Sequence, residues 1–239
     1  MLHFITFGGG TSGYNEAVSR ITSQIKASTL FDTVTGYLDT DLKSDLEFWN
    51  KHGSFIEKSP RGYGFWLWKP YLILKKLQEI SENDFLIYAD TGFEFDITKK
   101  GDLLKLKQTV IEKKFIGMPA GCSNDMHWTK KSTSDYFNLS TSLLQSVHIQ
   151  AGLLYMQNCK ALRDFIFRWY SIGSNNYAMI DDSPSTVPDY NGFRDHRHDQ
   201  SILSCLSKSV GWYNTQFIID NKSPFILARN RTGVSILNR

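Results

Sequence analysis

The stretch FLIYADTGFEF, residues 85–95, decides the fold of this chain. Its first five residues form an apolar run with aromatic and β-branched side chains, which predicts a strand buried on both faces. Asp90 ends this run, and Thr91 and Gly92 follow before the chain turns apolar again. A buried strand that carries a carboxylate at its carboxyl end indicates a binding or catalytic site at that end.

Strand and helix patterns alternate along the rest of the chain. In chain order they are a strand at 2–7, a helix at 14–27, a strand at 31–38, a helix at 40–52 with Thr40 as its cap, a helix that begins near Pro70, the strand at 85–89, a helix at 102–114, strands at 115–120 and 147–156, a helix at 158–172 and a helix that opens near Asp199. We therefore predict an α/β fold, a single domain over residues 1–239 with a mostly parallel central sheet flanked by helices. Ligands of such sheets bind beyond the carboxyl ends of the strands, where Asp90 lies.

Composition and charge narrow the function classes. With 239 residues and 41% hydrophobic content, the chain can bury a full core. A formal net charge of +3 with scattered Lys and Arg predicts no nucleic-acid partner. Three cysteines without a CxxC pair indicate a reducing compartment, and we find no signal-peptide pattern and no membrane-spanning apolar stretch. These features predict a cytoplasmic protein, and peripheral contact with the cytoplasmic membrane face stays open.

The segment RGYGFWLWKP, residues 61–70, is the first candidate binding site. Its Gly-x-Gly spacing allows a ligand to approach the backbone closely. Arg61 and Lys69 flank a predicted helix start, where backbone N–H groups favour an anion. This pattern predicts a phosphate-binding site, and the alternative is a turn that leads into a buried, tryptophan-rich helix.

Two acid-bearing segments are further candidates. Asp90 predicts a ligand of a divalent cation that bridges a diphosphate or, alternatively, a turn cap. The segment DHRHDQSIL gathers His196, His198, Asp199 and Gln200 where a loop meets a helix. Acid, base and amide side chains in one loop favour a functional site. The alternative is that Asp199 is only the N-cap of the helix.

Three other segments give weaker indications of a binding site. In each of them, taken alone, a structural role of the residues is the simpler explanation. They are IQAGLLYM with Ala151 and Gly152, IDDSPS with Asp181 and Asp182, and MHWTKK with His127, Trp128 and Lys130.

Taken in order, five of these segments resemble nucleotide-sugar glycosyltransferases of the GT-A fold. The similarity is greatest to small bacterial and viral enzymes of surface-polysaccharide assembly and more distant to the family 8 glycosyltransferases. The segments that carry it are RGYGFWLWKPYLILKKL, DFLIYADTGFEF, IQAGLLYM, IDDSPS and HRHDQSIL, and they cover about residues 1–215. In family 8, likewise, a strand that ends in an acid motif is followed by an NAG-like strand and then a DQ helix.

The resemblance implies a Rossmann-like donor half at 1–120 and an acceptor half at 121–239. Its activity would be transfer of a sugar from a nucleoside diphosphate to a glycan or lipid-linked acceptor. Asp90 would stand for the first acid of the family's Asp-x-Asp motif, which holds Mn²⁺ or Mg²⁺. Gly92 replaces the second acid, and Arg229 and Arg231 occupy the C-terminal region where a third, histidine ligand is expected. Either Asp90 binds the cation with diphosphate and water, or arginines neutralise the charge instead.

The resemblance also implies a role for each site residue. The donor-binding residues would be Thr6, Phe7, Gly8, Arg61, Gly64, Trp66, Lys69, Asp90, Thr91, Gly92, Gln150, Ala151 and Gly152. The acceptor-binding residues would be His127, Trp128, Lys130, Asp181, Asp182, His196 and His198. Asp199 would act as general base on an acceptor hydroxyl, beside Gln200.

Two other functions stay open. A sugar-nucleotidyltransferase shares the fold, but it usually carries a basic, glycine-rich first loop, and this chain has no Lys or Arg before Arg20. A non-catalytic carbohydrate-binding domain is the second alternative, although a binding domain has no need for Asp90 and Asp199 together.

Overall fold

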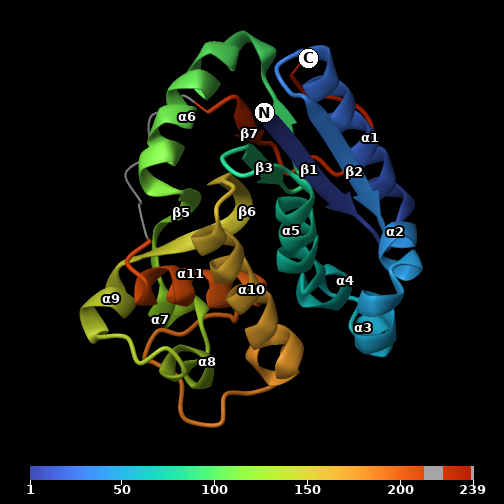
Figure 1. Cartoon of the computed structure of the whole chain (residues 1–239). Helices are drawn as coiled ribbons and strands as arrows, with labels where there is room; N and C mark the ends of the chain where they lie inside the picture. The colour runs from blue at the N-terminus through green and yellow to red at the C-terminus, as the bar shows by residue number, and fades with distance from the viewer. Residues whose placement is uncertain (213–222, 238–239) are drawn as a thin grey trace.

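Five strands form one central sheet in the order β2-β1-β3-β6-β5 (Figure 1). In the computed structural model, which describes residues 1–212 and 223–237, they are β1 (Leu2–Gly8), β2 (Thr33–Leu38), β3 (Phe85–Ala89), β5 (Phe115–Asn124) and β6 (Val147–Gln157). β1 pairs in parallel with β2 and β3, whereas β6 pairs antiparallel with β3 and β5. All strands except β6 therefore point the same way, which confirms the predicted α/β fold with a mostly parallel sheet.

Helices and a small second sheet complete the described part of the chain. The helices are α1 (Ser12–Ala27), α2 (Asp39–Ser44), α3 (Leu46–Lys58), α4 (Gly62–Phe65), α5 (Trp68–Glu79), α6 (Lys100–Lys113), α7 (Asp125–Trp128), α8 (Lys131–Asp135), α9 (Thr141–Gln145), α10 (Lys160–Asn175) and α11 (Asp199–Ser209). Two short 3₁₀ turns lie at Ile97–Lys99 and Tyr177–Met179. The second sheet pairs β4 (Phe93–Phe95) antiparallel with β7 (Phe225–Leu227).

The helix predicted at 40–52 is two helices, and the prediction of Thr40 as its cap is wrong. Thr40 lies inside α2, and Asp45 caps α3 by accepting a hydrogen bond from the Phe48 N–H at 3.3 Å. The same carboxylate accepts from the Tyr71 hydroxyl at 2.7 Å. A side chain with partners on both α3 and α5 fixes where the chain breaks between the two helices.

The core lies on both faces of the central sheet. Because side chains alternate along a strand, Ile5 and Phe7 of β1 face one way and Phe4 faces the other. The first pair belongs to a buried cluster with side chains of α3, α5, α10 and α11. Phe4 belongs to a second cluster with α1, α6 and the β4–β7 sheet. Helices on both faces explain why β3 is buried along its whole length.

Three segments meet at the carboxyl edge of the sheet. β1 ends at Gly8 and β3 ends at Ala89, and these strands are parallel, so both ends lie at the same edge. β6 runs the other way, with Leu153 opposite Ala89. The beginning of β6, residues 150–152, therefore lies beside Asp90.

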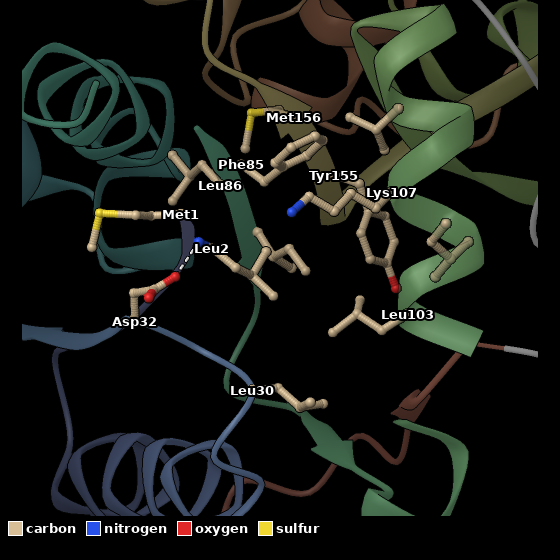
Figure 2. Close-up of a pocket in the computed structure, with 13 residues that line it drawn as sticks. Met1, Leu2, Leu30, Asp32, Phe85, Leu86, Leu103, Lys107, Tyr155 and Met156 are labelled. Carbon is tan, nitrogen blue, oxygen red and sulfur yellow. Dashed lines mark hydrogen bonds between the residues drawn. The ribbon is translucent and has the colours of Figure 1, made fainter. Parts of the chain in front are cut away.

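A cavity of about 150 Å³ lies at the opposite edge of the sheet (Figure 2). Its walls come from the amino ends of β1 and β3, with Leu2 and Phe85, and from α6, with Leu103 and Lys107. This cavity is therefore separate from the carboxyl edge that carries Asp90. No helix in the described residues is long and apolar enough to cross a membrane.

Candidate active site around Lys69

Lys69 joins the two acid-bearing segments that the sequence singled out. Its Nζ lies 3.3 Å from Asp90 Oδ1 and 3.1 Å from Asp199 Oδ2. The side chains of Lys69 and Asp199 are 3% and 4% exposed, whereas that of Asp90 is 39% exposed. Tyr88 adds a hydroxyl that donates to Asp90 Oδ1 at 2.5 Å. We call these four residues the Lys69 cluster, and Asp90 is its most accessible member.

Burial and charge oppose each other in this cluster. Burial alone would lower the pKa of Lys69, but the charges of Asp199 and Asp90 outweigh it and raise that pKa, so the lysine is an ammonium ion. Burial raises the pKa of Asp199 to about 6, against the attraction of Lys69 and with a contribution from the charge of Asp90. Burial likewise raises the pKa of Tyr88 well above its usual value. The cluster therefore holds one fixed cation and a carboxylate that titrates close to neutral pH.

A left-handed turn precedes Lys69. Five consecutive residues, Gly62 to Trp66, have φ angles between 53° and 84°. Tyr63, Phe65 and Trp66 are bulky, and each costs roughly 1–2 kcal/mol in this conformation. Contacts offset that cost, since the rings of Phe65 and Trp66 lie 4.9 and 5.4 Å from the His198 ring. The turn fixes the start of α5, where Lys69 is the second residue.

Gly64 has a structural role in this turn. It has φ +84°, and a Cβ there would lie 2.5 Å from Cγ1 of Ile56. The missing side chain of Gly64 therefore makes room for α3, and its donor-binding role stays a prediction. Pro70 is the third residue of α5 and not the first.

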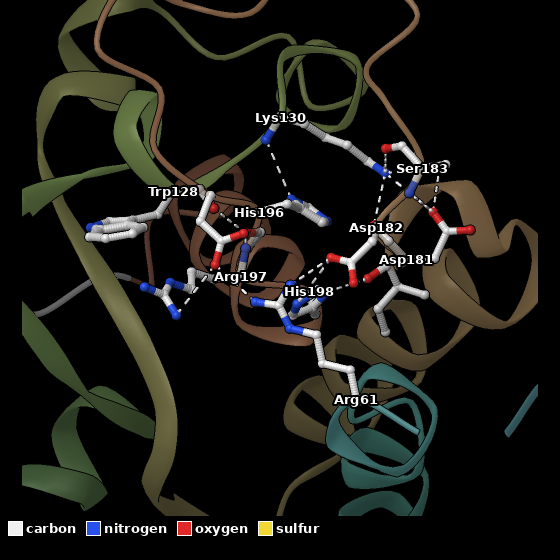
Figure 3. Close-up of polar contacts among 12 residues, drawn as sticks. Arg61, Trp128, Lys130, Asp181, Asp182, Ser183, His196, Arg197 and His198 are labelled. Atoms are coloured by element: carbon white, nitrogen blue, oxygen red, sulfur yellow. Dashed lines mark hydrogen bonds and ion pairs between the residues drawn. The ribbon is translucent and has the colours of Figure 1, made fainter. Parts of the chain in front are cut away.

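Arg61 lies in a different cluster from Lys69. Its Nη1 is 2.8 Å from Asp182 Oδ1 and its Nη2 is 2.9 Å from Asp195 Oδ2 (Figure 3). Arg197 also faces Asp195, at 3.6 Å. Two carboxylates therefore pair with the Arg61 guanidinium, and its place beside Lys69 at a diphosphate stays a prediction.

The predicted acceptor residues His196 and His198 are core histidines. Nδ1 of His196 accepts from the Lys130 backbone N–H, so its Nε2 donates to the carbonyl of Met179 at 3.0 Å. His198 Nδ1 donates to the carbonyl of Ile180 at 2.7 Å. Burial lowers the pKa of both rings, which are 5% and 2% exposed. His198 Nε2 has no hydrogen-bond partner among the described residues and lies 3.8 Å from Asp182 Oδ1, and the acceptor-binding role of the two histidines stays a prediction.

Lys130 is buried as well, and its role is structural. Its Nζ donates to the carbonyls of Asp181 and Ser183 at 3.1 and 3.0 Å and faces the Asp181 carboxylate at 3.4 Å (Figure 3). The Ser183 hydroxyl and N–H also donate to that carboxylate. Lys130 and Asp181 therefore hold the loop that follows Ile180, and their acceptor-binding role stays a prediction.

Trp128 and His127 are predicted acceptor residues with partly exposed side chains, and Asp181 and Asp182 are accessible as well. The guanidinium carbons of Arg197 and Arg194 lie 4.2 and 5.7 Å from the centre of the Trp128 ring. His127 donates its N–H to Asn124 Oδ1 at 3.2 Å, which caps α7.

The residues predicted beneath a nucleotide belong to the core. Thr6 is 1% exposed, and its hydroxyl donates to the carbonyl of Ala89 at 2.7 Å, which ties β1 to β3. The Phe7 ring stacks on Trp68 with 4.0 Å between ring centres. A Cβ on Gly8 would lie 2.5 Å from the carbonyl oxygen of Tyr14. These contacts show how the three residues pack, and the donor-binding roles of Thr6, Phe7 and Gly8 stay predictions.

The beginning of β6 packs against Asp90. The Asp90 N–H donates to the carbonyl of Gly152 at 2.8 Å, and a Cβ on Gly152 would lie 3.0 Å from Asp90 Oδ2. Gln200 Oε1 accepts from the Ala151 N–H at 3.2 Å, and the Gln150 amide donates to the carbonyl of Pro119. Gln200 therefore positions β6, and the small Gly152 leaves room for the Asp90 carboxylate.

The described residues do not form a protein-built metal site. Among 1–212 and 223–237, no group of three or more His, Cys, Asp and Glu side chains is placed to hold an ion. Oδ1 of Asp90 already faces the Lys69 ammonium and the Tyr88 hydroxyl, and Asp199 is buried on the other side of that ammonium. A divalent cation that takes six oxygen ligands does not fit this donor set.

Sequence reasoning missed Tyr88 and Arg20. Tyr88 lies two residues before Asp90 on the same strand, so period-two alternation could have placed both side chains on one side. Arg20 is 6% exposed and donates to the carbonyls of Thr91 and Phe93 at 2.5 and 2.9 Å. No local pattern in α1 indicates that contact, because its partners come from a distant segment.

Comparisons with known proteins give structural neighbours only. No protein-family model matches the chain, and no curated protein matches it in sequence. The galactosyltransferase LgtC in complex with donor and acceptor sugar analogs has a TM-score of 0.44 and 12% identity, over 98% of this chain and 84% of that one. An active-site mutant of LgtC has a TM-score of 0.41, 13% identity and the same coverage. Mouse xyloside xylosyltransferase 1 has a TM-score of 0.36 and 11% identity, over 86% and 81% of the two chains.

Proposed function

We propose that the chain is a glycosyltransferase that moves a sugar from a nucleoside diphosphate to a glycan or lipid-linked acceptor, in surface-polysaccharide or glycoconjugate synthesis. The observation that carries the proposal is the Lys69 cluster at the carboxyl edge of the sheet. It presents one accessible carboxylate, Asp90, backed by a buried ammonium and a buried second carboxylate, Asp199. Sugar transfer needs a carboxylate that orients the acceptor hydroxyl. It also needs a fixed positive charge close to the departing diphosphate.

Asp90 is the general base in this proposal. A base must lie within hydrogen-bond reach of the proton that it takes, and Asp90 is 39% exposed whereas Asp199 is 4% exposed. The acceptor oxygen forms a bond to the anomeric carbon, its proton passes to Asp90, and the bond from that carbon to the phosphate oxygen breaks. The electron pair of that bond leaves with the nucleoside diphosphate.

Asp199 positions Lys69. Its carboxylate lies 3.1 Å from the ammonium, and its backbone carbonyl accepts from the Trp169 indole N–H at 2.8 Å. The ammonium is therefore held between a buried anion and the accessible Asp90. This arrangement keeps Lys69 charged in spite of its burial and limits its side chain to one place.

The cofactor and the location remain part of the proposal. Mn²⁺ or Mg²⁺ has no protein-built site among the described residues, and Asp90 serves as the base, so such an ion would be held by the donor diphosphate and water. Cytoplasmic location, with peripheral contact at the membrane face, is the location that we expect for such an enzyme.

A transfer assay tests the proposal. Nucleoside diphosphate sugars are incubated with oligosaccharide or lipid-linked acceptors, and release of nucleoside diphosphate is measured. We expect release by the natural chain and a loss of roughly 100-fold or more in kcat for Asp90→Asn. Asp96→Asn is the matched control, since Asp96 lies close in sequence and its carboxylate accepts from Thr98.

Two results would overturn the assignment. Release of inorganic diphosphate from a nucleoside triphosphate and a sugar 1-phosphate would indicate a sugar-nucleotidyltransferase. Sugar binding without turnover of any donor would indicate a carbohydrate-binding domain. Full activity of Asp90→Asn would refute the general-base role of Asp90 but not the assignment as a glycosyltransferase.

A further inference from the structure

The segment 225–237, which we call the strap, crosses the turn that carries Asp90. Its β7 pairs with β4, and the Asn230 N–H donates to the carbonyl of Gly92 at 3.1 Å. A Cβ on Gly92 would lie 3.5 Å from the Cα of Arg229. The strap backbone therefore packs directly on position 92, where an acid was expected and glycine stands.

Arg20 fastens the strap to this turn. Its guanidinium donates to the carbonyls of Thr91 and Phe93 on the turn and to those of Asn230 and Thr232 on the strap, at 2.5 to 3.1 Å. One buried cation thus joins four backbone oxygens from two distant segments. These contacts fix the position of the strap relative to Asp90.

Glu94 fastens the strap a second time. The carboxylate is fully buried and accepts from Asn230 Nδ2 at 2.5 Å, from the Ile236 N–H at 2.9 Å and from the Ser235 hydroxyl at 2.5 Å. Burial would raise its pKa, but these hydrogen bonds outweigh burial and lower the pKa to about 2. The strap is therefore held at both ends of the segment that contains Arg229 and Arg231.

Arg229 and Arg231 are the cations that the strap presents. Both are exposed, and neither side chain makes a hydrogen bond or ion pair with a residue that the structure describes. The Arg231 guanidinium lies 5.6 Å from the Tyr14 ring, and its carbonyl lies 3.1 Å from where a Gly13 Cβ would be. Arg229 lies against Gly92. The two arginines therefore lie against the first turn of α1 and the turn that follows Asp90.

We propose that Arg229 and Arg231 bind the diphosphate of the donor and neutralise its charge as the sugar leaves. Guanidinium groups bind phosphate oxygens through paired N–H donors, and no group of His, Cys, Asp and Glu among the described residues is placed to hold a cation instead. This inference rests on the proposed function and names the groups that receive the negative charge. When the anomeric carbon–oxygen bond breaks, its electron pair stays on the terminal phosphate oxygen, and the arginines and Lys69 supply the positive charge that receives it.

Calorimetric binding of UDP, GDP and inorganic diphosphate, with a chelator or with Mn²⁺, tests the proposal. We expect binding in chelator, weakened roughly 10- to 100-fold in the Arg229→Ala, Arg231→Ala double variant. Uridine and guanosine should bind equally well to both proteins. Arg229→Lys, Arg231→Lys should restore part of the affinity for the diphosphates. Arg168→Ala is the matched control, because Arg168 is an exposed arginine on α10.

Three outcomes decide the question. Binding that requires Mn²⁺ and is unchanged in the double variant would overturn the proposal and indicate a metal. Equal loss for diphosphates and nucleosides would overturn it too, because the arginines would then not act on phosphate. A selective loss for diphosphates supports it even if no sugar transfer is found, so this result separates the arginine site from the proposed function. Unaltered circular dichroism melting of the double variant confirms that folding is intact.

Discussion

Replacing Asp199 by asparagine is expected to stabilise the fold while it impairs transfer. Burial raises the pKa of Asp199 to about 6, from 3.8 outside the fold. Between these pH values the folded chain keeps a proton that the unfolded chain has released, so the free energy of unfolding falls as pH rises. At about 1.4 kcal/mol for each pKa unit, the loss is about 3 kcal/mol near neutral pH. Asparagine is neutral and of similar size, so the variant avoids this loss.

Urea unfolding followed by tryptophan fluorescence measures the effect. Free energies of unfolding are compared between the natural chain and Asp199→Asn at steps from about pH 4 to about pH 8. The difference should grow in favour of the variant as pH rises and should reach about 3 kcal/mol. Asp164→Asn is the control, since its carboxylate is 60% exposed and pairs only with Lys160 on the same helix.

A difference that stays constant across this range would refute the reasoning. So would a variant that is less stable at the alkaline end, because the charge of Asp199 would then stabilise the fold. The transfer assay on the same protein completes the test. We expect Asp199→Asn to have a higher free energy of unfolding and a lower kcat than the natural chain. This combination would show that the Asp199 carboxylate destabilises the fold but is needed for activity.

Two further predictions concern packing. Asp125→Asn leaves the wholly buried Lys208 without its carboxylate partner at 2.5 Å; thermal denaturation should show a loss of about 3–5 kcal/mol, and a loss below about 1 kcal/mol would contradict a buried pair. Gly152→Ala places a methyl group 3.0 Å from Asp90 Oδ2; kcat should fall roughly 10- to 100-fold with little change in melting temperature, and an unchanged kcat would show that the position of this carboxylate is not critical.

Periodicity predicted the elements well because it reports local burial. Val18, Ile21 and Ile25 lie on one side of α1 and are all buried, as their spacing predicted. The sheet edge could be predicted too, since a buried strand that ends in Asp90 delivers its carboxylate there. Neither inference depends on contacts between distant segments.

The partners of charged side chains could not be predicted in the same way. Arg61 and Lys69 lie close in sequence and both read as phosphate ligands, yet one pairs with Asp182 and the other with Asp199. That choice depends on how the long irregular segment before α11 folds back. The burial of His196 could not be predicted for the same reason. Its partner, the carbonyl of Met179, lies 17 residues away in sequence and comes close only in the folded chain.

The left-handed turn before α5 has a consequence for how the site is assembled. Its five positive φ angles are unfavourable, and the rings of Phe65 and Trp66 lie against His198, which belongs to the second half of the chain. The place of Lys69 therefore depends on contacts between the two halves. A fragment that stops at residue 120 would lack both His198 and Asp199, so the Lys69 ammonium would lose its buried partner.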